Sequence, residues 1–312
     1  MDLKQLRAFL AVVETGTVTR AADVLNLVQP AVSRQIRLLE EDIGSPLFER
    51  ERQGMVLTAA GQALEGYARR ALLELDRGRA EVMNTTAGEL GGLVTIGLLP
   101  STVDILASPL VSAVAKKYPG IRLRIAVGYA GTLLQWLASG EVDATLLYGA
   151  EHSPNVHSTP LIEEALWAIG PASSGLSPDK PVSLQALTRH KLVLPSAPHG
   201  IRTLFKHACA LANVNFDIAV ETNALSAQRS LVLGGHGLTI LPPIAVSPDL
   251  ASGRLTGAPF ENPGISRTIV LAVPTHRPTP RHVQYAVDAL VQEVEYATRS
   301  GAWPEGKWLG AI

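Results

Sequence analysis

Residues 25–44 read LNLVQPAVSRQIRLLEEDIG, and this stretch carries two different faces of one predicted helix. Pro30 fits the first turn, where the N–H group that proline lacks would have no partner. At about 100° of rotation per residue, Val32, Ile36, Leu39 and Ile43 fall within one narrow arc, which predicts a core-facing side. A second arc, well away from the first, gathers hydrogen-bonding side chains that are expected to contact a polar partner: Gln29, Ser33, Arg34 and Arg37.

The residues before this stretch predict two further helices. Apolar residues recur at helical spacing over residues 3–13, and Gly16 is expected to end the first helix. Thr17 or Thr19 is expected to cap a second, short helix. The small side chains at 21–22 would let that helix cross the third one closely. Two helices joined by a short turn, the second of them polar on its outer face, are typical of a helix-turn-helix unit.

The residues after the stretch predict a small β-hairpin, or wing. Residues 47–50 and 55–57 are predicted to form short strands around a turn at Gln53-Gly54. Arg50 and Arg52 lie on this hairpin, where they are well placed to contact phosphate. A helix with two arginines on its outer face is usually only a solvated surface. The interpretation as a winged helix-turn-helix therefore rests on the order of all these elements and not on the third helix alone.

The charge balance does not by itself point to nucleic acid. The chain of 312 residues has a formal net charge of −1. Residues 1–65 hold seven Lys and Arg against nine Asp and Glu. A DNA-binding interpretation therefore rests on where the arginines lie and not on how many there are.

The run AADVLNLVQPAVSRQIRLLEEDIGSPLFER, followed by VLTAAGQAL, resembles the DNA-binding signature of the LysR-type transcriptional regulators. The match covers roughly residues 2–65 nearly without gaps. The resemblance implies that side chains of the third helix face the major groove, where Gln can bind adenine and Arg can bind guanine with two hydrogen bonds each. It implies that the wing arginines bind the DNA backbone. The implied DNA contacts are Thr19, Gln29, Pro30, Ser33, Arg34, Arg37, Arg50 and Arg52.

Two positions depart from the family pattern. The family commonly has Ser or Thr just before the Gln, where it caps the helix, and this chain has Val28. An apolar side chain cannot accept from the unpaired N–H groups, so the cap is expected to be weaker by about 1 kcal/mol. Position 18 is Val where the family often has Phe, which is a change in packing only.

A long helix is predicted from Thr58 to about residue 87, followed by a hinge at residues 85–92, whose composition is rich in Thr and Gly. Packing of this helix on its own domain is one alternative. A charged opposite side (Arg69, Arg70, Glu74, Arg77, Glu81) favours a partner helix instead. The resemblance implies a dimerisation helix, and a two-fold pair would bind a palindrome. The apolar positions with coiled-coil spacing are Leu64, Ala68, Ala71, Leu75, Gly78 and Val82.

Strand and helix patterns alternate from residue 93 onward, which predicts a parallel α/β sheet. A second set begins near Glu164, and the chain returns to the first set at residues 266–273 and in a last helix over 280–299. Two halves joined by crossovers near 161–164 and 263–268 would leave a cleft. Over about residues 92–297 the pattern resembles the family's effector-binding domain, whose fold is like that of periplasmic binding proteins.

Ligands of such folds lie at the carboxyl ends of strands, beside helix N-termini, where N–H groups and hydroxyls suit an anion such as a carboxylate. Ser101, Thr102 and Ser196 could instead be simple helix caps, and His199 could order its loop. The family often has Ser or Thr where this chain has Ala130, so one polar contact is expected to be missing. The candidate effector contacts are Pro100, Ser101, Thr102, Tyr129, Ala130, Ser196, His199 and Thr222.

A catalytic site is not predicted. GxSxG, HExxH and phosphate-loop motifs are missing, residues 234–237 hold only a lone GxG, and His152, His157, His190 and His207 lack metal-ligand spacing. The single Cys209 excludes an intrachain disulfide and a cysteine-built zinc site, and its apolar neighbours predict burial. No catalytic residue, metal or cofactor is therefore expected. The alternatives are a metabolic enzyme or a small-molecule binding module with a vestigial DNA-binding head, and a solute-binding transport receptor.

The fold class predicted is α/β, with an N-terminal winged helix-turn-helix, a long linker helix and a periplasmic-binding-protein-like effector domain of two subdomains. The expected boundaries are 1–58, 59–91 and 92–312, with 92–162 and 267–312 in subdomain I and 163–266 in subdomain II. No apolar run reaches the roughly 18 residues of a membrane span, and the N-terminus lacks a secretory pattern. We therefore expect a cytoplasmic transcriptional regulator with no membrane partner.

The expected partners are promoter double-stranded DNA, a small effector such as a carboxylate, a second copy of the chain in a homodimer and then a homotetramer, and, as a further candidate, RNA polymerase. The last residues, 303–308 (WPEGKW), have no role that the sequence assigns.

Overall fold

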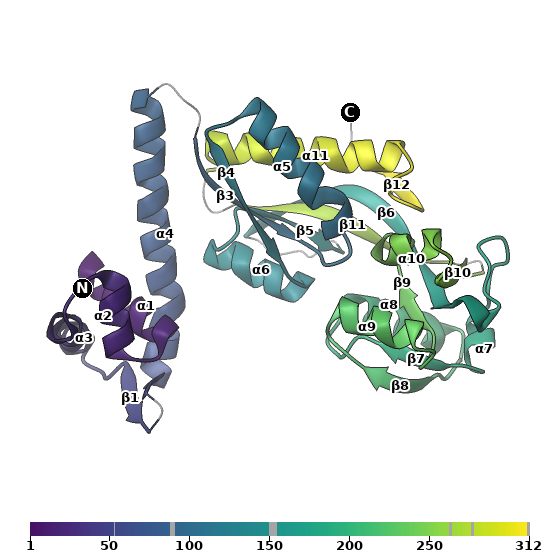
Figure 1. The fold of residues 1–312 in the computed structure, drawn as a ribbon, viewed down its shortest axis with the longest axis horizontal. Helices are drawn as coiled ribbons and strands as arrows, with labels where there is room; N and C mark the ends of the chain where they lie inside the picture. Colours follow the sequence, from purple (N-terminus) through teal and green to yellow (C-terminus); the bar gives the residue numbers. More distant parts are fainter. Residues whose placement is uncertain (53, 88–90, 150–154, 262–263, 276–277, 311–312) are drawn as a thin grey trace. The chain divides into compact units, whose positions relative to one another are not determined.

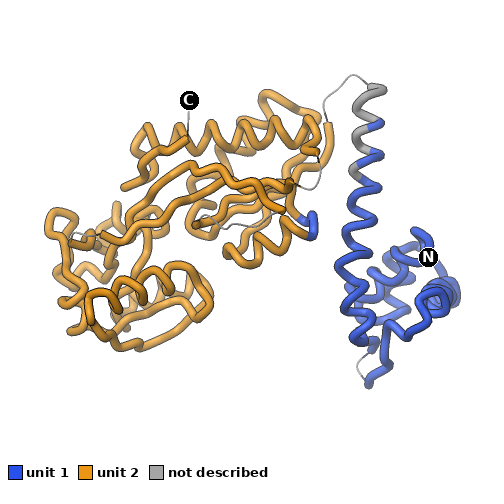
Figure 2. The backbone as a smooth tube through the Cα atoms, turned by 180° about the vertical axis from the view of Figure 1, so that it is seen from behind, with its two compact units in different colours: residues 1–89, 139–141 blue, residues 90–138, 142–312 orange. Residues whose placement is uncertain are grey.

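The computed structural model describes residues 1–52, 54–87, 91–149, 155–261, 264–275 and 278–310, with side chains left out at 77, 80, 81 and 83–87. Contacts divide the chain into two compact units, residues 1–89 with 139–141 and residues 90–138 with 142–312 (Figure 2). The centre of the predicted hinge, residues 88–90, and His152 lie outside the described residues.

Unit 1 contains the predicted three helices and hairpin. Asp2 and Gln5 form a capping box at the start of the first helix, and Gly16 ends it in the left-handed conformation. The second helix is capped by Thr17, whose side chain accepts from the N–H of Arg20, and not by Thr19. The elements are α1 (Leu3–Thr15), α2 (Val18–Leu25), α3 (Gln29–Ile43), β1 (Phe48–Glu51), β2 (Gly54–Leu57) and α4 (Ala59–Ala87), labelled in Figure 1.

The hairpin is held against the helices by backbone groups. Glu40 of α3 accepts through Oε1 from the N–H of Leu47, at 2.8 Å, just before β1. The N–H of Met55 in β2 donates to the carbonyl of Gly16, at 2.8 Å. Gly54 is required here because a Cβ atom would lie 2.4 Å from that same carbonyl oxygen. The wing is thus fixed relative to the polar face of α3.

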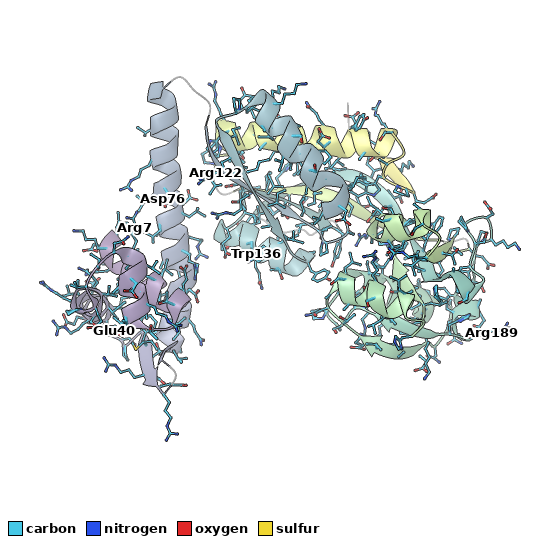
Figure 3. All side chains as sticks on the ribbon, in the orientation of Figure 1. Arg7, Glu40, Asp76, Arg122, Trp136 and Arg189 are labelled. Carbon is cyan, nitrogen blue, oxygen red and sulfur yellow. The ribbon has the colours of Figure 1, made fainter. Side chains whose placement is uncertain are left out.

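The middle of the long helix α4 packs on α1. An ion pair joins Arg7 of α1 to Asp76 of α4 at 3.8 Å, and Figure 3 shows the two side chains on facing helices. Arg69 of α4 donates to Glu14 of α1 at 2.7 Å. Thr58 caps the helix by accepting from the N–H of Gly61 at 3.0 Å, as the sequence predicted.

Unit 2 alternates strands and helices as predicted, with α5 and α11 on one face of its larger sheet and α6 on the other (Figure 1). Its first part comprises β3 (Gly92–Leu98), α5 (Val103–Lys117), β4 (Ile121–Val127), α6 (Ala130–Ser139), β5 (Ala144–Tyr148) and β6 (Val156–Pro171). Its second part comprises α7 (Leu184–Leu187), β7 (Lys191–Leu194), α8 (Gly200–Leu211), β8 (Asp217–Glu221), α9 (Leu225–Leu233), β9 (Thr239–Leu241), α10 (Ser247–Ala251) and β10 (Leu255–Pro259). The chain ends with β11 (Ile265–Pro274), α11 (Arg281–Arg299) and β12 (Gly306–Trp308).

The sheet is mixed, and the prediction of a parallel sheet is wrong in this respect. β3 runs parallel to β4 and β5, and β7 runs parallel to β8. β6 and β11 are antiparallel to each other, and β9, β10 and β12 all join β6 antiparallel. The alternation of elements indicates which segments are strands. It does not give the direction of β6 and β11, which depends on the path by which the chain crosses from one half to the other and back.

β6 begins before the predicted start of the second half near Glu164 and carries the chain from one hydrophobic core to the other. One core gathers residues of β3, β4, β5, α5 and α11, and the other gathers residues of β7, α8, β9 and the C-terminal part of β6. Cys209 lies in the second core, and burial raises the pKa of its thiol to about 11, so it is a packing residue and not a reactive thiolate. Among the described residues, no helix combines the length and apolar composition that a membrane span requires.

Candidate functional site

The polar face of α3 is open to solvent as the sequence predicted. Gln29, Arg34 and Arg37 are exposed and Ser33 is half-buried, with Gln29 Nε2 donating to Ser33 Oγ at 2.9 Å. Together with Arg50 of β1 these side chains line one groove on unit 1, which is also lined by Glu40 and by the apolar residues Val18, Ile36, Phe48 and Met55.

The charged groups around this groove differ in how far they are already paired. Arg37 lies 3.5 Å from Glu41 one helical turn on, whereas Arg34 and Arg50 have no ion pair within the described part of unit 1. Arg52 and Thr19 are exposed but do not line the groove, and Pro30 does. Glu40 also lines the groove, and its Oε1 accepts from the N–H of Leu47. The groove thus presents two guanidinium groups that have no ion pair among the described residues, beside an amide, and this donor set suits base edges and phosphates.

Val28 is the N-cap of α3 and makes no side-chain cap hydrogen bond, as its apolar side chain predicts. We expect Val28→Ser to raise the free energy of unfolding of unit 1 by about 1 kcal/mol, because a hydroxyl can accept from an unpaired N–H of the first turn. Chemical denaturation followed by far-ultraviolet circular dichroism measures this. Val28→Ala is the control, and a stability gain of equal size in Val28→Ala would contradict the capping explanation.

Unit 2 holds a small pocket with a cavity volume of about 30 Å³, which opens into a wider space of about 340 Å³ that includes solvent. Four of the predicted effector contacts line it: Pro100, Ser101, Tyr129 and His199. The other lining residues are Leu99, Tyr148, Ile201, Leu225, Gln228, Leu241, Pro242 and Arg267.

The structure does not bring the other four predicted contacts to this pocket. Thr102 is fully buried, and its hydroxyl donates to the carbonyl of Leu99 at 3.0 Å. Ala130 is buried in the first turn of α6. Thr222 Oγ1 accepts from the N–H of Ala224 at 3.3 Å, and the N–H of Ser196 donates to the carbonyl of Thr222 at 3.3 Å. The hydroxyls of Thr102 and Thr222 thus bond to the backbone of their own loops.

Arg267 is the pocket residue that sequence reasoning missed. Its side chain is only 4% exposed, and its Nε donates to Glu164 Oε1 at 2.6 Å. Its Nη2 donates to Ser101 Oγ at 3.1 Å. In the sequence, Arg267 is a lone arginine within the apolar strand SRTIVLAV, which is unusual enough to suggest a function. The sequence does not show which residues it meets, because the start of β11 lies beside the end of β5 only through the antiparallel pairing of these strands.

Two tyrosine hydroxyls occupy helix N-termini in the pocket. Tyr148 accepts from the N–H of Gly200, the first residue of α8, at 3.3 Å. Tyr129 accepts from the N–H of Leu225, the first residue of α9, at 3.1 Å. Burial raises the pKa of Tyr129, so its phenol stays neutral. Tyr148 ends the predicted strand VDATLLYG, and the rule that ligands meet strand ends would have found it.

His199 lies between these tyrosines, with ring centroids 4.9 Å from Tyr129 and 6.1 Å from Tyr148. Its Nδ1 accepts from the N–H of Ile201 at 3.3 Å, which caps α8. Burial, and then the positive charge of Arg267, lowers the pKa of His199 to about 4. The imidazole is therefore neutral near pH 7, with its proton on Nε2.

This pKa predicts an acid-sensitive unit 2. Below the ordinary pKa of 6.5 the unfolded chain binds a proton at His199 that the folded chain does not, until the pH approaches 4. The free energy of unfolding should therefore fall by about 2 kcal/mol between pH 7 and pH 5 from this group alone. Urea denaturation at both pH values measures the fall. His199→Asn, which can still cap α8, should lose less stability over this interval, and an equal loss would contradict the assignment.

The pocket combines one buried guanidinium, neutral hydroxyls and an imidazole with apolar walls from Leu99, Ile201, Leu225 and Leu241. Ser101 has a guanidinium and not a base as its hydrogen-bonding neighbour, so its hydroxyl is not activated as a nucleophile. No group of three His, Cys, Asp or Glu side chains that could hold a metal ion occurs among the described residues. The arrangement suits binding of a small anion with an apolar body and not catalysis.

A winged helix-turn-helix with an open polar groove, joined in one chain to an α/β unit with a small-molecule pocket, defines a ligand-responsive DNA-binding protein. The family models agree with this class. Residues 3–62 match the bacterial regulatory helix-turn-helix protein, lysR family, and residues 87–295 match the LysR substrate binding domain. The chain belongs to the LysR family.

Relatives match over nearly the whole chain. The HTH-type transcriptional regulator BbuR of Bordetella bronchiseptica is 30% identical over 304 residues, which are 97% of this chain and 93% of that protein. A probable hydrogen peroxide-inducible genes activator of Streptomyces viridosporus is 31% identical over 277 residues, 88% of each chain.

Solved structures share the fold. A full-length OxyR variant from Pseudomonas aeruginosa has a TM-score of 0.69 at 24% identity and covers 95% of each chain. Full-length CbnR in complex with its target DNA has a TM-score of 0.72 at 21% identity and covers 95% of this chain and 100% of CbnR. The protein is thus a LysR-type transcriptional regulator, with a DNA-binding helix-turn-helix and an effector-binding domain, and it is not an enzyme.

Proposed function

We propose that the regulator responds to a small anionic effector, such as a carboxylate with an apolar body, bound in the pocket of unit 2. This proposal rests on the guanidinium of Arg267, which is buried and lines the pocket. Only its Nε–H bonds to Glu164, so its other N–H groups can face a ligand. A buried guanidinium favours an anion strongly, because the low local dielectric strengthens their attraction. The neutral imidazole of His199 and the neutral phenol of Tyr129 add no negative charge, so an effector competes for the guanidinium with the carboxylate of Glu164.

The test uses a matched pair of probes, phenylacetate and phenylacetamide, which differ mainly in charge. Isothermal titration of the full-length protein is expected to give saturable binding of phenylacetate and at least tenfold weaker binding of the amide. A ligand that binds only the folded state also raises the melting temperature, which gives a second measurement. Equal affinity for the two probes, or binding of neither, would contradict an anion-selective pocket.

We also propose that the groove of unit 1 binds promoter DNA. Gln29, Ser33, Arg34 and Arg37 would contact bases and flanking phosphates, with Thr19 and Pro30 beside them and Arg50 and Arg52 on the backbone. The exposure of this set, and two arginines without an acidic partner in the described part of unit 1, support the assignment. Since promoter DNA lies in the bacterial cytoplasm, the protein would act there. RNA polymerase would be a further partner at the promoter.

A homodimer formed through α4 would place two copies of this DNA-binding unit in a two-fold symmetric arrangement. The predicted seam is divided. Leu64 and Ala68 pack into the core of unit 1, so the prediction is wrong for these two, whereas Leu75 at 45% and Val82 at 66%, seven residues apart, are exposed in the single chain. Such a seam is usually buried against a partner helix. Sedimentation should therefore give the mass of a dimer or of the tetramer formed by two dimers, and a monomer at micromolar concentration would contradict it.

The effector would act by shifting a population of arrangements. The proposed domains are residues 1–58, 59–91 and 92–312, and the two separate cores support the further division of the last one into 92–162 with 267–312 and 163–266. An effector that binds one arrangement of these two halves better than another moves the equilibrium by that difference in affinity. The two DNA-binding heads of a dimer would then change their spacing on the promoter.

A further inference from the structure

Glu164 lies in the middle of β6 and engages both of its carboxylate oxygens. Oε1 accepts from Nε of Arg267 at 2.6 Å, and Oε2 accepts from Nε1 of Trp303 at 2.9 Å. The exposed fraction is 0% for the Glu164 side chain, 4% for that of Arg267 and 1% for Trp303. A pocket arginine and an indole from the C-terminal segment therefore share one buried carboxylate.

The C-terminal segment holds this indole firmly in place. The N–H of Trp303 donates to the carbonyl of Ala297 at 2.9 Å, just before the end of α11. β12 then pairs with β6 so that Gly306 lies opposite Glu164. A Cβ atom at Gly306 would lie 2.7 Å from Cδ1 of Trp303, so only glycine allows the chain to fold back so closely. This segment lies beyond residue 295, where the match to the family model ends.

The shared carboxylate restricts how Arg267 can pair. Arginine and a carboxylate commonly form two parallel N–H···O bonds, one to each oxygen. Here the indole N–H occupies Oε2, so Arg267 donates to Oε1 through Nε, and its Nη2 donates to Ser101 Oγ at 3.1 Å. Each carboxylate oxygen has two acceptor sites, so the indole N–H acts by fixing the orientation of the carboxylate plane. Without it, the carboxylate could rotate to accept a second N–H of the guanidinium, which would turn away from Ser101.

We propose that Trp303 is a positioning residue of the effector pocket: by occupying one oxygen of Glu164, it keeps the guanidinium of Arg267 turned toward Ser101 and the bound anion. This inference rests on the proposed anionic effector. Under this proposal the C-terminal segment affects effector affinity through the hydrogen bond of Trp303, in addition to packing against the core.

The test compares two tryptophans of the same segment. Trp303→Phe removes the indole N–H that bonds Glu164, whereas Trp308→Phe removes a buried indole N–H that has no hydrogen-bond partner among the described residues. Trp303→Phe is expected to weaken phenylacetate binding about tenfold, a typical loss when one charge-assisted contact is misplaced. Trp308→Phe should leave the affinity within about twofold of the wild type. Equal losses in both variants would mean that Trp303 acts only through packing, and would overturn the proposal.

A second readout needs no ligand. Burial, and then the charge of Arg267, lowers the pKa of His199, and among the described residues the other titratable side chains that face this imidazole are those of Tyr129 and Tyr148. Withdrawal of Arg267 toward Glu164 should therefore raise the pKa of His199 in Trp303→Phe and not in Trp308→Phe. NMR titration of the full-length protein labelled with ¹³C-histidine measures this, with His199→Asn to assign the signal. A His199 pKa equal to that of the wild type in Trp303→Phe would overturn the positioning role.

The two readouts separate this inference from the proposed function. If the wild type binds no phenylacetate, the anionic effector is contradicted, and the histidine titration still decides whether Trp303 sets the position of Arg267. If the smaller phenylalanine leaves a cavity that unfolds unit 2, benzothienylalanine at position 303 carries the same test. It replaces the indole N–H by sulfur at nearly the same volume.

Discussion

Arg34→Ala is expected to weaken binding of the regulator to its specific site by about 10- to 100-fold. Arg34 is exposed on the polar face of α3, lines the groove of unit 1 and has no ion pair within the described residues. Its guanidinium is therefore available to form two hydrogen bonds with a guanine, a contact worth about 1–3 kcal/mol of discrimination. The loss should be confined to specific DNA, because a base contact contributes little to nonspecific affinity.

Fluorescence anisotropy over a salt series measures this effect. The DNA lying upstream of the gene that encodes the regulator is compared with a scrambled sequence of the same length. Arg50→Ala serves as a contrast: removal of a phosphate contact should weaken binding to both DNAs and reduce the salt slope by about one. Arg189→Ala, on the surface of unit 2 (Figure 3), should change neither. If Arg34→Ala binds both DNAs like the wild type, Arg34 does not contact the operator.

Arg267→Met is expected to destabilise unit 2 by about 3–5 kcal/mol as well as to abolish anion binding. The substitution keeps most of the side-chain volume but leaves the carboxylate of Glu164, whose side chain is 0% exposed, without its ion-pair partner. An unpaired buried charge costs more than the intact pair contributes, so removing one partner has a large effect. The remaining hydrogen bond from Trp303 offsets only part of this cost.

The four tryptophans, Trp136, Trp167, Trp303 and Trp308, all belong to unit 2, so intrinsic fluorescence during urea denaturation reports on that unit. The decisive control is the double variant with Glu164→Gln, which removes the buried charge as well. It should recover at least half of the lost stability, because a neutral amide can still accept from the indole. A single variant as stable as the wild type, or a double variant less stable than the single one, would show that the pair is not the source of the effect.

In unit 1, most of what the sequence predicted depends on interactions between residues that are close together in the chain. The start of α1 at Asp2, its end at Gly16 and the missing side-chain cap at Val28 are all set by residues within one turn of each position. Helical periodicity correctly placed Val32, Ile36 and Leu39 in the core and the arginines outside, but it was wrong for Ile43, which is 38% exposed at the last residue of α3. The choice of Thr17 over Thr19 as the cap of α2 was left open by the sequence, and the observed backbone decides it.

In unit 2 the sequence predicted the strand–helix alternation and four of the twelve residues that line the pocket. It could not place Thr102, Ala130, Ser196 or Thr222, since a residue next to a pocket residue along the chain can point the other way. It also missed Arg267, because that residue meets Ser101 only through the pairing of β11 with β5 and β6.

Local patterns were enough to predict the family, the type and order of most elements, and the polar face of α3, since periodicity, caps and turn residues act within a few positions of the chain. The direction of β6 and β11, the sharing of Glu164 by Arg267 and Trp303, and the place of the C-terminal segment in the core became known only from the folded chain. The difference comes from the range of the forces involved. Strand direction and buried ion pairs join residues more than one hundred positions apart, where the free energy depends on how whole layers pack and not on any local preference.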